Sequence, residues 1–112
     1  MGDAPVPPYA ARETELYIET KGKRTDIQKN LESVKVRLLE NPKQAAHSKR
    51  MVGPSKGLRE AHITGNWRVI FTICEECREL GEQDTNKPKC LDCGDQPNET
   101  VNFLFVMDPH GT

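Results

Sequence analysis

Residues 58–73 read "LREAHITGNWRVIFTI", and this segment predicts a β-hairpin. "LREAHI" is a short candidate strand, and "TGN" has the composition of a tight turn. In "WRVIFTI" the residue types alternate along the chain, so that Trp67, Val69 and Phe71 share one face and Arg68 lies on the other. The hairpin therefore has an apolar face for a core and a second face that carries a cation.

A helix is predicted upstream of the hairpin, in residues 25–42, "TDIQKNLESVKVRLLENP". Thr25 followed by Gln28 matches a capping box at the start, and Pro42 marks the end. Apolar residues recur at the spacing of one helical face. These residues are Ile27, Leu31, Val34 and Leu38.

The rest of the chain sets the fold class. Residues 14–20, "TELYIET", alternate apolar and polar side chains and predict a first strand, whereas the proline-rich residues 1–12 predict a flexible arm. Residues 101–107, "VNFLFVM", are apolar on both faces, as in a central strand that is buried on two sides. A strand, a helix and then a run of strands predict one α+β domain over residues 13–112, with the helix packed on a mostly antiparallel sheet.

Composition limits the classes of protein that this chain fits. Its 112 residues suit a single domain, and its net charge of −1 gives no global indication of a polyanionic partner. Residues 43–70, in contrast, carry six basic side chains and one acidic side chain, a local charge of +5. The sequence has no run of about 18 apolar residues and no signal-peptide order at its start, so we expect no membrane association and a cytoplasmic location.

All the cysteines fall in residues 74–93, "CEECRELGEQDTNKPKCLDC". Their spacing, C-x2-C-x12-C-x2-C, is typical of a tetrahedral zinc site, and four thiolates leave no open coordination position, so the expected Zn²⁺ is structural. Two disulfides or two redox pairs are the alternatives, which a reducing cytosol and the missing βαβ context disfavour. The metal would close a zinc-ribbon-like hairpin inserted between the last two strands. Its expected ligands are Cys74, Cys77, Cys90 and Cys93.

Two segments resemble the RelE/ParE toxin superfamily. Members share a "KGL(R)E" block followed by "YRVIY" after a helix that ends in "NP". Residues 51–73 contain "GPSKGLRE" and "GNWRVIF", and residues 103–112, "FLFVMDPHGT", resemble the family's last strand and histidine-bearing end. The resemblance implies a RelE-like fold, in which the zinc hairpin is an addition.

The resemblance also implies a function. Members of the RelE branch are toxins of type II toxin–antitoxin systems, which cleave mRNA on the ribosome without a metal and are restrained by an antitoxin protein. Attack of a ribose 2′-OH on the adjacent phosphate requires a base, an acid and cations that hold the developing negative charge. The implied partners are therefore an antitoxin, the ribosome and mRNA.

Residues for these roles lie in the matching segments. Arg68 corresponds to the arginine of the family's "YR" pair, and Arg59 is a second candidate cation. His110 matches a C-terminal histidine of some members and suits a general acid, while Glu60 and His62 are candidate bases. The side chains expected to grip the RNA backbone are Lys49, Arg50 and Lys56.

Other interpretations stay open. Arg59 and Glu60 also fit a surface ion pair, His110 a frayed terminus, and His47 and His62 solvent-exposed positions without a catalytic role. At the level of the whole protein, the alternatives are a ParE-like toxin that binds gyrase and cuts no RNA, and a non-catalytic zinc-ribbon adaptor. The acidic, aromatic-free ribbon sequence disfavours the adaptor as a reader of nucleic acid.

Overall fold

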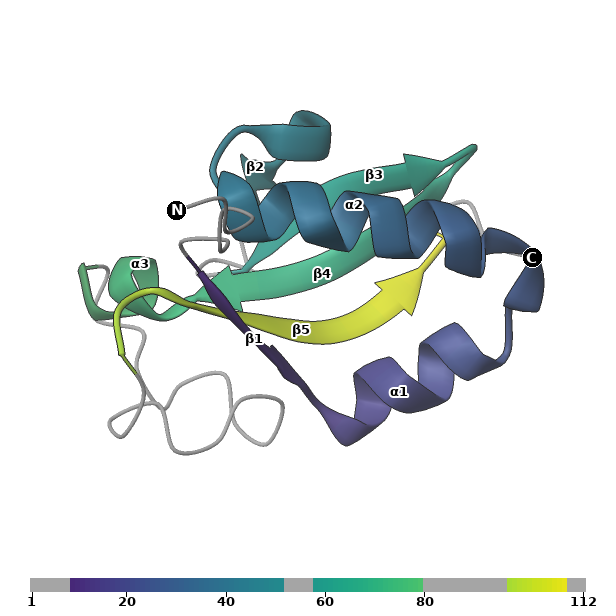
Figure 1. Ribbon diagram of the computed structural model, residues 1–112, viewed down its shortest axis with the longest axis horizontal. Coiled ribbons are helices and arrows are strands. Elements are labelled where there is room, and N and C mark those ends of the chain that lie inside the picture. Colours follow the sequence, from purple (N-terminus) through teal and green to yellow (C-terminus); the bar gives the residue numbers. More distant parts are fainter. Residues whose placement is uncertain (1–8, 52–57, 80–96, 109–112) are drawn as a thin grey trace, which may run out of the picture.

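The computed structural model describes residues 9–51, 58–79 and 97–108 of the chain. Within these segments, five strands form a sheet in the order β1-β5-β4-β3-β2 (Figure 1). Strand β1 is parallel to β5, and the other neighbouring pairs are antiparallel, which confirms the predicted α+β class. In chain order the elements are β1 (Ala10–Glu13), α1 (Glu15–Gly22), the 3₁₀ turn η1 (Thr25–Ile27), α2 (Gln28–Glu40), the 3₁₀ turn η2 (Ala45–His47), β2 (Lys49–Arg50), β3 (Arg59–Thr64), β4 (Trp67–Ile73), α3 (Cys74–Glu79) and β5 (Thr100–Met107).

The predicted hairpin is present as β3 and β4. Glu60 lies opposite Ile70, and His62 lies opposite Arg68 in the antiparallel register. Gly65 forms the turn with a φ of +56°, a left-handed conformation that glycine adopts without the steric cost of a side chain. The hairpin thus fixes which side chains of the two strands are neighbours.

Helix α2 lies across one face of the sheet (Figure 1). Leu31, Val34 and Leu38 are buried on its inner side, as the sequence periodicity predicted. The helix ends at Glu40, shortly before Pro42, which confirms the predicted stop. None of the described helices is long and apolar enough to cross a membrane.

The predicted capping box at the start of this helix is wrong. A 3₁₀ turn comes first, and the cap position of α2 makes no side-chain hydrogen bond. Instead of reaching back to Thr25, the Gln28 side chain donates a hydrogen bond to the carbonyl of Lys21, 3.1 Å away. The amide therefore ties the start of α2 to the end of α1.

The strand predicted for residues 14–20 is also wrong, because this segment forms helix α1. The Thr14 hydroxyl caps the helix by accepting a hydrogen bond from the Tyr17 N–H at 3.1 Å. Tyr17 is the buried residue of the segment, while Leu16 and Ile18 are exposed. The alternation of polar and apolar residues failed as a guide because Tyr17, rather than the aliphatic residues, faces the core.

The flexible arm predicted for residues 1–12 fails at residues 10–12, which belong to β1. The strand pairs in parallel with β5, with Ala10 opposite Thr100. Its partner lies at the other end of the chain, and local composition carries no signal for such pairing. Residues 1–8 lie outside the described part of the chain.

Strand β5 is buried on both faces, as predicted. Phe103 lies opposite Phe71, but Phe105 lies opposite Ile70, so that Leu104 is an extra residue in a β-bulge. Phe103 packs in the core beneath α2, whereas Leu104 packs with Ile70 in a second cluster. Alternation lets β5 face both clusters, and the bulge turns the consecutive residues Leu104 and Phe105 toward the same one.

Candidate functional site

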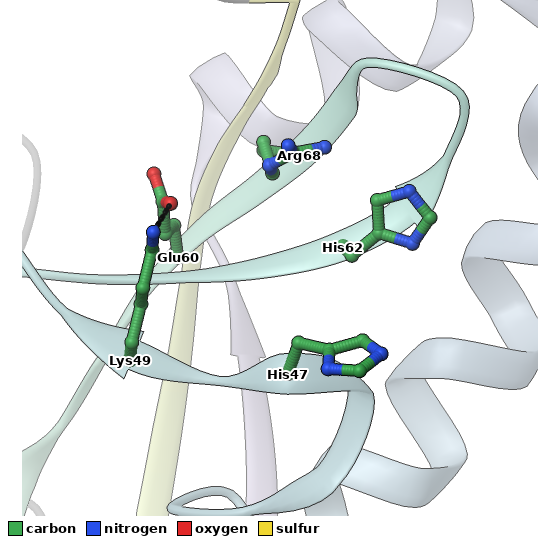
Figure 2. Close-up of a pocket in the computed structure, with 5 residues that line it drawn as sticks. All are labelled: His47, Lys49, Glu60, His62 and Arg68. Atoms are coloured by element: carbon green, nitrogen blue, oxygen red, sulfur yellow. Dashed lines mark ion pairs between the residues drawn. The ribbon is translucent and has the colours of Figure 1, made fainter.

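Five polar side chains line a groove of about 350 Å³ on the surface formed by η2, β2, β3 and β4 (Figure 2). Two of them are imidazoles, two are cations and one is a carboxylate. The β3–β4 hairpin supplies three of them, and the η2–β2 segment supplies the other two. They are His47, Lys49, Glu60, His62 and Arg68.

Strand alternation sets the groove side of the hairpin. Ala61 and Val69 are fully buried in the core beneath α2, so their neighbours point to the opposite face of the sheet. These neighbours include Glu60, His62 and Arg68, which the sequence predicted as site residues. The structure brings these three side chains together in the groove.

A hydrogen bond fixes the orientation of His62. Its Nε2 lies 2.9 Å from the carbonyl oxygen of Gly65 in the hairpin turn. A carbonyl oxygen can only accept, so Nε2 carries the proton of this bond. In the neutral ring Nδ1 then has a free lone pair, and the imidazole is prepared to accept a proton.

His47 lies across the groove from His62. The two ring centroids are 6.3 Å apart, and the rings meet edge to face at 77°. Ala46 and His47 have φ values of 53° and 58°, in the left-handed region that costs about 1–2 kcal/mol for a residue with a side chain. The backbone turn thus holds the second imidazole in a conformation that costs free energy.

An ion pair crosses the groove between β2 and β3. Lys49 and Glu60 are directly opposite in the register, and Lys49 Nζ lies 3.3 Å from Glu60 Oε1. The lysine side chain is 71% exposed, so water and salt weaken this pair. An anion that enters the groove can therefore displace the Glu60 carboxylate as the partner of Lys49.

Arg68 supplies the second cation. Its guanidinium is partly buried, and the described contact of Nη1 is the carbonyl of Trp67 at 3.3 Å. On the other side of Trp67, the Arg24 guanidinium stacks 4.4 Å from the ring centroid. Arg68 has no carboxylate partner among the described residues and can accept an anionic ligand.

Together these side chains can hold an anion and move protons beside it. Two imidazoles allow one ring to accept a proton while the other donates one, which is the arrangement that acid–base catalysis needs. Arg68 and Lys49 supply positive charge for a phosphate group.

Arg59 does not face this groove, so the prediction of a second substrate-binding arginine is wrong. Its residue is 7% exposed. Nε and Nη2 donate to the two carboxylate oxygens of Glu76 at 2.8 and 3.0 Å, and Nη1 donates to Ser48 Oγ at 3.0 Å. Burial raises the pKa of Glu76, but the hydrogen bond and charge of Arg59 and the charge of Arg50 outweigh burial, so that this pKa lies below its usual range. The surface pair between Arg59 and Glu60 that the sequence also allowed is replaced by a buried pair with another partner.

The remaining predicted site residues fall into two groups. Lys49 lies in the groove, whereas Arg50 Nε turns to Glu76 Oε2, 3.1 Å away, at the edge of the buried pair. Lys56 and His110 lie outside the described residues. Their predicted roles as an RNA-binding lysine and a general acid stay predictions.

Two of the four predicted zinc ligands are in the described part of the chain. Cys74 and Cys77 are buried on helix α3, whereas Cys90 and Cys93 lie outside the described residues. Asn102 Nδ2 lies 3.3 Å from Cys74 Sγ. Among the described residues no group of three or more His, Cys, Asp or Glu side chains could hold a metal ion.

Sequence reasoning missed two features of this region. His47 was considered only as a solvent-exposed residue, although it lies next to the basic Lys49–Arg50 segment. Glu76 was read as part of an acidic ribbon, and nothing in "CEEC" distinguishes the buried Glu76 from the exposed side chain of Glu75. The position of His47 beside His62 and the pairing of Glu76 with Arg59 both depend on contacts between segments that are distant in the sequence.

No protein-family model and no curated protein sequence matches the chain. Two solved structures are similar to it, both of YafQ from E. coli. The protein from strain BL21(DE3) is 12% identical with a TM-score of 0.60, and a histidine-to-glutamine variant is 14% identical with a TM-score of 0.59. Each comparison covers 91% of this chain and 94% of the YafQ chain. The described sheet and helices therefore have a RelE/YafQ-like α+β fold.

Proposed function

We propose that this chain is the toxin of a type II toxin–antitoxin pair and that it cleaves mRNA on translating ribosomes. The observation that carries the proposal is the groove, which brings His47, His62 and Arg68 together. The YafQ-like fold and the resemblance of residues 51–73 to the RelE branch support the same assignment.

The proposed reaction begins at His62. Its Nδ1 accepts the proton of a ribose 2′-OH while the Gly65 carbonyl holds the ring through Nε2. The 2′-oxygen then forms a bond to phosphorus. Arg68 and Lys49 stabilise the additional negative charge on the phosphoryl oxygens, and Glu60 loses its lysine partner as the phosphate binds.

The reaction ends when the bond from phosphorus to the 5′-oxygen breaks. His47, on the opposite side of the groove, donates a proton to the leaving oxygen, which leaves a 2′,3′-cyclic phosphate and a 5′-OH. Acid–base catalysis of this kind contributes about 10²–10⁴-fold to a rate. His110 is the alternative acid that the family resemblance implies, and separate His47→Gln and His110→Gln variants distinguish the two.

A second hollow extends the path for RNA. It has a volume of about 290 Å³, is lined by Lys49, Arg50, Met51 and Glu60, and shares the lysine and the glutamate with the catalytic groove. The nucleotide next to the scissile phosphate fits this position, with Lys49 between the two phosphates. Lys56 follows in the sequence and is proposed to bind the RNA backbone further along.

The direct test is cleavage in a reconstituted translation reaction with a reporter mRNA. Primer extension on RNA from the complete reaction should show cuts with 5′-OH ends. The same RNA without ribosomes should stay intact, and the His47→Gln/His62→Gln double variant should leave it intact in both reactions.

The outcomes separate the candidate functions. Equal cutting of free RNA would reject the ribosome dependence. Intact mRNA together with inhibited DNA supercoiling would replace the proposal by the ParE-like, gyrase-binding function. Arrest of growth in cells, relieved by the product of an adjacent open reading frame, would support the proposed antitoxin partner and a cytoplasmic site of action.

We also propose that the chain binds a structural Zn²⁺ through Cys74, Cys77, Cys90 and Cys93. The support is the spacing of the cysteines and the placement of Cys74 and Cys77 three residues apart on α3, which puts both thiols on one side of the helix. The amide of Asn102 beside Cys74 Sγ is the kind of donor that orients a metal-bound thiolate. The metal would have a structural role and take no part in cleavage.

A further inference from the structure

A buried ionic cluster lies behind the strand that carries the groove residue Lys49. The side chains of Arg59 and Glu76 are 8% and 2% exposed and form a two-pronged pair. Ser48 Oγ accepts from Arg59 and donates to the carbonyl of Pro42 at 2.6 Å. Arg50 Nε adds a further hydrogen bond to Glu76 at 3.1 Å. The cluster therefore joins α3 and β3 to the segment on both sides of Lys49.

The direction of the side chains connects this cluster to the groove. Ser48 and Arg50 turn toward Arg59 and Glu76, whereas His47 and Lys49, at the alternate positions, line the groove. A shift of this short segment toward or away from the cluster would move both groove side chains together.

The backbone before Ser48 needs such a restraint. Ala46 and His47 both have left-handed φ values, which residues with a side chain keep only where the surroundings hold them. Strand β2 has two residues and lies at the edge of the sheet, so its pairing with β3 gives little support. The bonds of Ser48 to Arg59 and to Pro42 hold the segment directly after the strained turn.

Stability alone gives a poor account of the cluster. A buried ion pair usually stabilises a fold no better than apolar side chains of the same size, because the loss of hydration offsets the attraction. Its geometry, in contrast, is directional, since a guanidinium and a carboxylate bind in one plane at fixed distances.

We infer that Arg59 and Glu76 are positioning residues that hold His47 and Lys49 in place against His62 and Arg68. The effect on cleavage rests on the proposed function, whereas the effect on the geometry of the groove does not.

The test replaces the charged pair by apolar side chains, in the double variant Arg59→Met/Glu76→Leu. The matched control is Glu13→Leu/Lys35→Met, which removes a partly buried ion pair between β1 and α2 that contacts none of the groove residues named here. Because a double variant can fail to fold, Ser48→Ala serves as a third protein. It keeps the ion pair and removes only the hydroxyl that links Arg59 to the segment.

The first readout is the position of the histidine ring resonances in ¹H–¹³C NMR spectra, assigned with single His→Gln variants. The His47 resonance should shift in Arg59→Met/Glu76→Leu and in Ser48→Ala, and it should stay in place in Glu13→Leu/Lys35→Met. An unshifted His47 in both test variants overturns the inference, whether or not the protein cleaves RNA.

The second readout is the single-turnover rate of mRNA cleavage on ribosomes. Misplacement of a catalytic group by about 1 Å costs up to about 100-fold in rate. The rate should therefore fall by about 10–100-fold in the double variant, with ribosome affinity unchanged and with no loss in the control. If the parent cleaves and the variant cleaves equally fast, the inference is wrong. If the parent does not cleave while His47 shifts, the proposed function fails and the positioning role stands.

Discussion

At the scale of single residues, Arg68 is the cation whose removal tests the groove most directly. It is partly buried on the sheet face away from α2, so Arg68→Ala should change the free energy of unfolding by less than about 1 kcal/mol. The rate of mRNA cleavage should fall by about 10²–10³-fold, because the phosphate loses a preorganised donor. Arg68→Lys keeps the positive charge but loses the planar guanidinium, so its cleavage rate should lie between those of the parent and Arg68→Ala.

The control for this prediction is Arg37→Ala, which removes an exposed arginine from α2 on the other side of the sheet. Cleavage should stay at the parent rate in this variant, and thermal melts should show that all three proteins are folded. An Arg68→Ala protein that cleaves as fast as Arg37→Ala would remove Arg68 from the site.

Part of the site follows from local sequence and part does not. Arg68 was predicted from its match to the family's "YR" pair, and Glu60 and His62 from their residue types within the same segment. The sequence does not tell which face of residues 58–63 meets the substrate, and the observed register of the hairpin supplies that face. Arg59 lies on the other face, and its buried partner Glu76 is supplied by α3 after the next strand. A periodic pattern gives the face on which a side chain lies, but it does not tell which distant segment covers that face.

At the scale of elements, Thr14 decides where α1 begins and how it attaches to the sheet. Its hydroxyl accepts a hydrogen bond from the Tyr17 N–H at 3.1 Å and donates one to the Leu104 carbonyl at 2.7 Å. Thr14→Ala should therefore lower the free energy of unfolding by about 1–2 kcal/mol, measured by urea denaturation. Thr14→Ser keeps the hydroxyl and should be close to the parent. Equal stability of the alanine variant would show that neither bond contributes.

The proposed zinc site makes a prediction for α3. Mass spectrometry under native conditions should find about one zinc per chain, because four thiolates form one closed tetrahedral site. Removal of the metal by a chelator should lower Tm, since the free energy of metal binding is coupled to folding. Cys74→Ser/Cys77→Ser should bind no zinc and melt at the temperature of the chelated parent. A metal-free parent with an unchanged Tm would reject the site.

Helix α1 shows why one element could not be predicted. In residues 14–20 the apolar letters Leu16 and Ile18 suggested a strand face, yet both side chains are exposed and Tyr17 packs against Phe103 at a centroid distance of 5.5 Å. The segment is helical because Thr14 caps it and because the sheet offers a site for one large ring. The longer helix α2 was predicted, apart from its start, because Leu31, Val34 and Leu38 recur at the spacing of one helical face.

At the scale of the whole molecule, the antiparallel part of the sheet was predictable and its parallel edge was not. The hairpin and the two-sided strand at residues 101–107 fixed three neighbouring strands. The position of β1 depends on its pairing with β5 near the other end of the chain. Short-range sequence patterns carry no information about such pairing. An ion-pair cluster joins β1, at this edge of the sheet, to helices α1 and α2 and holds the strand in place.

That cluster is centred on Glu13 of β1. The carboxylate forms ion pairs with Lys35 of α2 and with Lys21 of α1, the second at 3.5 Å between Oε1 and Nζ. Burial by itself raises the pKa of Glu13, but the hydrogen bond and charge of Lys35, followed by the charge of Lys21, outweigh burial and hold the pKa below its usual range. Glu13 therefore binds a proton less readily in the folded chain than in the unfolded chain.

The stability of the fold should consequently depend on pH through Glu13. A carboxyl with a lowered pKa in the folded state contributes stability that is fully present above its unfolded pKa, about 4.3, and is lost as pH falls through the folded pKa. Urea denaturation from neutral pH to about pH 3 should show this loss of stability in the parent. The loss should be smaller in Glu13→Gln, because the glutamine side chain does not titrate. Glu40→Gln removes an exposed carboxyl at the end of α2 and should keep the dependence of the parent. Because release of the proposed zinc would affect all three proteins alike, the difference between the curves isolates Glu13. Identical curves for the parent and Glu13→Gln would show that the cluster does not hold the parallel edge.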